Sequence, residues 1–162
     1  MSKLQPYIAA LAERTGLPLE LSPGGSFAAL LGGKRLLIKE ASGDTFLFYM
    51  EVGRPTLFRR GEVLTSLMGG NLFLAETRGA ALSYDECNEM VGLNLILQLH
   101  HLESGDFINA VDNIVAAAED WRRKLESLNA GAGERARQAG AAAPENNSQM
   151  PDALSPPQMI RV

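Results

Sequence analysis

The stretch RGEVLTSLMGGNLFLAETRGAALSYD, residues 60–85, decides the fold that we expect for this chain. Its first apolar residues have the three- and four-residue spacing of one helix face: Val63, Leu64, Leu67 and Met68. Two glycines then interrupt the pattern, and three bulky residues at 72–74 precede a turn and an extended segment at 81–84. One helix face cannot bury all of these side chains. We therefore expect either an ordinary core helix or a surface covered by a second copy of the chain.

The sequence before this stretch has the pattern of an antiparallel meander. Strands are expected at 26–31, 34–41 and 45–52, with tight turns between them. Both alternating faces of the third strand are apolar, with Phe46, Phe48, Met50 and Val52 on one face and Leu47 and Tyr49 on the other. One face should pack on helices. The other is more apolar than a solvated sheet face normally is.

Helices are expected at both ends of the folded part. Residues 4–15 have helical spacing, with Pro6 in the first turn and a Gly-Leu-Pro stop at 16–18. Residues 89–99 alternate as a strand with one leucine-rich face. An apolar stripe over 107–128, with Ser104 or Asp106 as the cap, predicts a six-turn helix. The expected order is α-β-β-β-α-β-β-α, an α+β fold with helices packed on a twisted antiparallel sheet.

Composition limits the class of protein. Residues 1–128 are expected to form one domain, and 129–162 a flexible tail rich in Gly, Ala and Pro without aromatic residues. The formal net charge of -4 argues against a nucleic-acid groove. A single cysteine fits a reducing cytoplasm. No apolar run approaches the ~20 residues of a membrane span, so we expect none.

Residues that carry chemistry are few. His100 and His101 are adjacent, so their side chains point in different directions, and the sequence has no third histidine to complete a metal site. Cys87 follows Asp85 and Glu86, whose negative charges oppose thiolate formation. We therefore expect no catalytic residue, metal or cofactor. A small enzyme with unfamiliar residues stays an alternative.

Several local strings, taken in their order along the chain, resemble one protein family. Residues 71–74 (NLFL) and 79–85 (GAALSYD) look like the second helix and fourth strand of class I type III secretion chaperones, the Tir-chaperone or CesT-like family. Residues 15–19 (TGLPL) are similar to the exit of the family's first helix, and 118–123 (AEDWRR) to its last helix. The resemblance covers residues 4–128, and the longer C-terminal tail departs from it.

This resemblance implies a homodimer in the bacterial cytoplasm that binds an extended N-terminal segment of a secreted effector protein and keeps it ready for export. The dimer contact is then expected at Val63, Leu64, Leu67, Met68, Leu72 and Phe73. The effector-binding residues are expected to be Ile8, Leu11, Phe27, Leu30, Leu47 and Tyr49. The alternative is a regulatory adaptor on the same fold that binds a secretion-system component, such as a regulator or the export ATPase.

Overall fold

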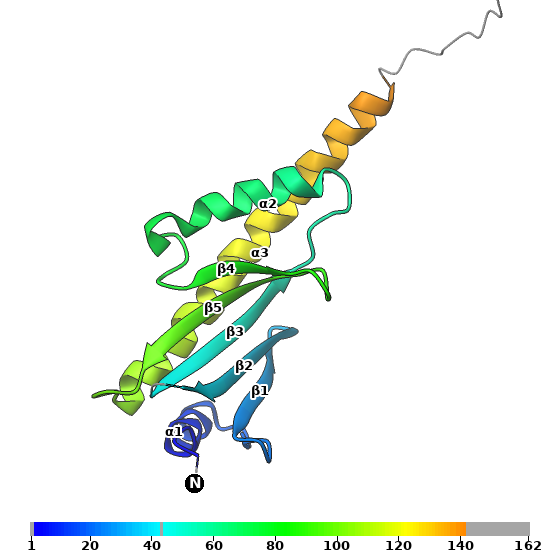
Figure 1. The fold of residues 1–162 in the computed structure, drawn as a ribbon. Coiled ribbons are helices and arrows are strands. Elements are labelled where there is room, and N and C mark those ends of the chain that lie inside the picture. The colour runs from blue at the N-terminus through cyan, green and yellow to red at the C-terminus, as the bar shows by residue number, and fades with distance from the viewer. Residues whose placement is uncertain (1, 43, 142–162) are drawn as a thin grey trace, which may run out of the picture.

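The computed structural model describes residues 2–42 and 44–141, which form a single antiparallel sheet with the longest helix along one face (Figure 1). The helices are α1 (Gln5–Thr15), α2 (Arg60–Met68), the short 3-10 helix η1 (Gly69–Leu74) and α3 (Ser104–Ala141). The strands are β1 (Ser26–Leu31), β2 (Lys34–Ala41), β3 (Thr45–Gly53), β4 (Ala81–Asp85) and β5 (Met90–Gln98). The expected α+β class and element order are confirmed, with η1 as an addition between α2 and β4.

The strand order in the sheet is β1-β2-β3-β5-β4. β1, β2 and β3 form the expected meander, and β5 pairs with β3, so that Phe48 lies opposite both Ile38 and Leu95. β1 and β4 are therefore the edge strands. The side-chain amide of Asn71 covers part of the β4 edge, because it donates to the Leu82 carbonyl (3.1 Å) and accepts from the Leu82 N–H (2.7 Å). The outer edge of β1 has no strand partner within the described residues.

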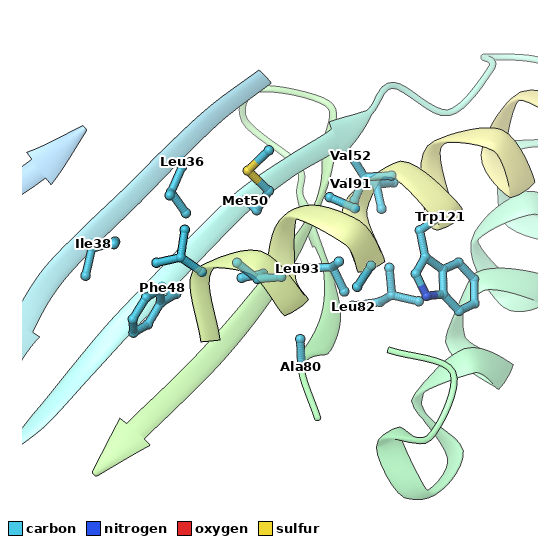
Figure 2. Packing of buried hydrophobic residues seen from close by; sticks show 14 of the residues in the cluster. Leu36, Ile38, Phe48, Met50, Val52, Ala80, Leu82, Val91, Leu93 and Trp121 are labelled. Atoms are coloured by element: carbon cyan, nitrogen blue, oxygen red, sulfur yellow. The ribbon is translucent and has the colours of Figure 1, made fainter. Parts of the chain in front are cut away.

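The core lies between the sheet and α3, which runs along one face of the sheet (Figure 1). Figure 2 shows side chains of β2, β3, β4 and β5 pointing toward this helix. Near α1, four aromatic rings pack together, with the Tyr7 and Phe107 centroids 5.1 Å apart. The buried aliphatic and aromatic residues of the sheet are Phe27, Leu36, Ile38, Phe46, Phe48, Met50, Val52, Leu82, Val91 and Leu93.

The last helix is longer than expected. We expected it to end near Leu128, with a tail from 129, but α3 continues to Ala141, and Ala132 is fully buried. Each glycine in this part costs a helix about 1 kcal/mol relative to alanine, but extending an existing helix needs no new nucleus. The alanines between the glycines are the best helix formers, so the helix propagates. The rest of the expected tail, 142–162, lies outside the described residues.

A tryptophan joins η1 to α3. The indole of Trp121 lies so close to Gly70 that a Cβ at that position would be 2.0 Å from the ring. Its Nε1 donates to the carbonyl of Glu76 (3.1 Å), and the Lys124 ammonium lies 4.2 Å from the ring centroid. Only glycine allows this approach, because any side chain at 70 would overlap the ring. The contact determines where η1 lies relative to α3.

Candidate protein-binding site

An apolar groove opens between α1, β1 and α3. Its volume is about 320 Å³, and its walls are the residues Leu11, Arg14, Thr15, Leu17, Leu19, Phe27, Ala29, Leu31, Val111, Asp112, Val115 and Ala116. The groove exists because α1 ends at Thr15 and the following chain turns away before β1 begins. Leu17 is thereby left 52% exposed at the rim. An ion pair between Arg14 and Asp112 (2.5 Å) also lies at the groove, so the apolar floor has a charged border.

The expected effector-binding residues divide between two faces of the sheet. Leu11 and Phe27 line the groove on the helix side. Ile8 is fully buried in the core and does not reach the surface. The other three belong to the alternate positions of β1 and β3, which face away from the core: Leu30, Leu47 and Tyr49. The structure therefore does not bring the six residues together on one surface.

The open face of the sheet is apolar at its centre. Tyr49 lies opposite Leu37 on β2 and Asn94 on β5, and the neighbouring row pairs Leu47 with Ile96, which is 62% exposed. Burial raises the pKa of the Tyr49 hydroxyl above its usual value, and the negative charges of nearby carboxylates add to the shift. The hydroxyl is therefore protonated at neutral pH and can donate a hydrogen bond to a partner backbone.

The position of the Tyr49 ring depends on Gly92. A Cβ at 92 would be 2.3 Å from the ring Cε2 atom and 2.8 Å from Cζ. We expect Gly92→Ala to push the ring off its present position and to lower the free energy of unfolding by about 1–3 kcal/mol. Urea unfolding followed by circular dichroism measures the change.

Two further variants make this prediction specific to the ring. In a Tyr49→Ala background the same Gly92→Ala change should cost much less, because the clashing atoms are gone. Gly105→Ala serves as the control, since a Cβ at 105 meets no atom within 4 Å. If Gly92→Ala lowers the free energy of unfolding equally with and without the Tyr49 ring, the contact between Gly92 and the ring is contradicted.

The expected dimer residues separate into buried and exposed sets. Val63 and Leu67 are buried in the core of the single chain, where α2 packs on α3, and their place at the dimer contact stays a prediction. Leu64 is partly buried, while Met68 and Leu72 are exposed. Phe73 is 90% exposed and has a left-handed backbone (φ 55°). Met68, Leu72 and Phe73, with the neighbouring Leu74, form an apolar surface at the end of α2 and in η1, which we name the η1 surface.

Sequence reasoning missed several residues of these surfaces. In the groove they are Leu17, Leu19, Leu31 and Val115, and on the open sheet face they are Leu37 and Ile96. The alternation of β1 and β2 in the sequence could have identified Leu31 and Leu37. The exposed pair Leu57 and Phe58, just before α2, was also missed. No periodic pattern marks these two, because they lie in a loop.

The residues considered for chemistry do not form a site in the described part of the chain. His100 and His101 follow β5, with their ring centroids 4.3 Å apart, and Cys87 is exposed in the turn between β4 and β5. No group of three or more His, Cys, Asp or Glu side chains suited to a metal ion occurs among residues 2–42 and 44–141. No described helix combines the length and apolar character needed to cross a bilayer.

Comparison with protein families identifies the chain. The model of the Tir chaperone protein (CesT) family matches residues 7–122, which include all the residues that line the groove and form the η1 surface. The chain belongs to this family. The resemblance to CesT-like secretion chaperones is thereby confirmed. A search of curated protein sequences finds no match.

Solved structures show the same CesT-like fold. The ExsC–ExsE complex matches with a TM-score of 0.68 and 22% identity, over 77% of this chain and 97% of that chain. The ExoT–SpcS complex from Pseudomonas aeruginosa matches with a TM-score of 0.57 and 19% identity, over 74% and 98%. The Yersinia pestis type III secretion chaperone SycH, in complex with a fragment of YscM2, matches with a TM-score of 0.56 and 16% identity, over 74% and 97%. At these identities the matches establish a shared fold.

Proposed function

We propose that this CesT-family chain is a type III secretion chaperone that binds the N-terminal segment of an effector protein in the bacterial cytosol and keeps it competent for export. The groove between α1, β1 and α3 carries the proposal, because it is apolar, open and lies beside an unpaired strand edge. Two of the similar structures, ExoT–SpcS and HopA1–SchA, the latter a chaperone–effector complex, support this class of partner.

The groove and the β1 edge together suit an extended segment. A strand added to the edge of β1 would form main-chain hydrogen bonds and place alternate side chains on opposite faces of the sheet. On one face these side chains lie near Phe27 and Ala29 in the groove, and on the other near Leu30, which is 75% exposed. One bound segment can therefore contact expected residues on both faces of β1, whereas Leu47 and Tyr49 lie two strands further into the sheet, on β3. Ordering it costs about 1–2 kcal/mol per residue in backbone entropy, so a preformed apolar surface is required.

The homodimer is part of this proposal. Of the six residues expected at the contact, Leu64, Met68, Leu72 and Phe73 remain at or near the surface of one chain. A second copy that covers the η1 surface would bury these side chains by a two-fold contact, in which the same patch is used by both chains. The dimer would then present two grooves to one effector segment. The residues assigned here to both functions stay predictions.

A substitution in the groove tests effector binding. We expect Ala29→Glu to weaken effector binding by about tenfold or more, because it places a charge among apolar walls where an apolar side chain would bind. Ser127→Glu is the control, since Ser127 is exposed on α3 and lines neither the groove nor the β1 edge. The effector is first identified by mass spectrometry after pull-down from the native cytosol, and its affinity for both variants is then measured by titration calorimetry.

Equal affinities of the two variants would move the effector site away from the groove. Recovery of a single folded regulator, with no secreted protein, would favour the regulatory adaptor instead. Recovery of the export ATPase together with effectors would extend the proposal to a docking role.

A further inference from the structure

A second hollow lies at the other end of the molecule, between the loop before α2 and the C-terminal part of α3. Its volume is about 360 Å³, and it is lined by Phe58, Asn129, Ala130, Gly133, Ala136 and Arg137. Leu57 and Phe58 are 70% and 66% exposed beside it. The side chain of Asn129 holds the loop in place, because it donates to the Arg54 carbonyl (3.0 Å) and accepts from the Thr56 N–H (2.8 Å). The hollow is therefore a preformed apolar surface.

Most of the lining of this hollow, all but Phe58, lies outside the part of the chain that matches the family. The family match ends at residue 122, whereas most of the hollow's lining belongs to 129–137. About three quarters of this chain aligns with almost the full length of each of the similar structures. In Figure 1, the end of α3 projects past the sheet, at the opposite end of the molecule from α1, whose residues line the groove. The hollow is therefore separate from the proposed effector site.

Near the hollow the arginines Arg54, Arg59, Arg135 and Arg137 outnumber the carboxylates Glu62 and Glu134, although the whole chain is acidic. Arg59 and Arg135 both pair with Glu62, the second at 3.7 Å. Arg54 and Arg137 form no ion pair with any residue of 2–42 or 44–141. A complementary occupant would carry bulky apolar side chains with carboxylates on either side.

We propose that residues 145–154 of the same chain, ENNSQMPDAL, occupy this hollow. The segment carries Met150 and Leu154 as apolar side chains, with Glu145 and Asp152 on either side of Met150. It begins four residues after the end of α3, and the hollow reaches Arg137, about one helical turn before that end. Ten extended residues span up to about 33 Å, so the segment reaches the whole hollow. Because the segment is tethered, its effective concentration is in the millimolar range, and weak contacts suffice.

Amide resonances of the hollow in the full-length protein test this proposal. We expect Met150→Ser to shift the resonances of Ala130, Gly133 and Ala136 in a two-dimensional nitrogen–proton spectrum, because the anchoring side chain is lost. Met159→Ser is the matched control, since it makes the same change in the same part of the sequence but outside the segment. Asp152→Lys, or raised salt, should shift the same resonances in the same direction.

Three results would overturn the assignment. Unchanged resonances in Met150→Ser would show that the segment does not occupy the hollow. Equal shifts in Met159→Ser would assign the hollow to a different part of the C-terminal sequence. Shifts that follow dilution of the wild-type protein would assign it to a second copy of the chain.

Discussion

Replacing Trp121 by alanine is expected to lower the free energy of unfolding by about 3–5 kcal/mol. The indole is 2% exposed and fills the space against Gly70, where no side chain at 70 could replace it. Its removal leaves a cavity between α3 and η1. The Glu76 carbonyl also loses the hydrogen bond that it accepts from the indole N–H. Because η1 is a short 3-10 helix with few other contacts to α3, it cannot easily collapse onto the space.

Unfolding in urea followed by the helical circular dichroism signal measures this loss. Tryptophan fluorescence is unsuitable, because Trp121 is the only tryptophan of the chain. Lys124→Ala is the matched control, since it removes the cation above the ring and the exposed ion pair with Glu76 but keeps the indole. We expect this control to cost about 1 kcal/mol or less. Similar losses in both variants would mean that the indole does not hold η1 against α3.

The periodicity of the sequence predicts the helices and strands of the fold, except the short 3-10 helix η1. Alternation gave β3 and β5 nearly at their observed bounds, and the Gly-Leu-Pro stop predicted the end of α1. The end predicted for α3, near Leu128, is wrong, because a Gly- and Ala-rich composition such as that of 129–141 is typical of disordered segments as well as of helix extensions. Composition alone does not show that a long helix already precedes such a segment and can extend through it.

The binding surfaces were harder to predict, because they depend on how elements pack. Helical spacing groups Val63, Leu67 and Met68 on one stripe, but it does not show which edge of the stripe faces α3. The packing of α2 buries the first two and leaves Met68 exposed. The groove is formed by three elements that are far apart in sequence, so residues such as Leu31 and Val115 become neighbours only in the folded chain.

Backbone strain in η1 is also invisible in the sequence. Phe73 and Leu74 both have positive φ (55° and 54°), a conformation that costs a non-glycine residue roughly 1–2 kcal/mol. In a single chain the Phe73 ring is almost fully exposed, so burial of the ring does not offset this cost. Other described residues share this backbone, namely Asp44, Arg59, Arg78, Glu89 and His101, but none of them has a large apolar side chain. Strain is one feature of sites where a partner or ligand uses the geometry. Phe73 is therefore the residue of the η1 surface that a second copy is most strongly expected to cover.

We expect Phe73→Glu to convert the proposed homodimer to a monomer. Burying a phenylalanine side chain contributes about 1.5–3 kcal/mol, and a two-fold contact contains it twice, so the loss is about 3–6 kcal/mol per dimer. That loss raises the dissociation constant by roughly two to four orders of magnitude. Multi-angle light scattering during gel filtration at micromolar concentration measures the change as a halving of the mass. Leu30→Glu, an exposed leucine on the distant strand β1, is the control and should leave the mass unchanged.

Phe73→Gly separates the loss of the contact from a loss of folding. Glycine adopts the left-handed backbone at position 73 without strain, so the isolated chain should be as stable as the wild-type chain or more stable, by roughly 1 kcal/mol. The same variant lacks the ring, so it should also be monomeric. A monomer whose thermal unfolding temperature no longer depends on protein concentration would fit both expectations. A dimer that persists in both variants would place the contact between copies on another surface, such as the open face of the sheet around Ile96.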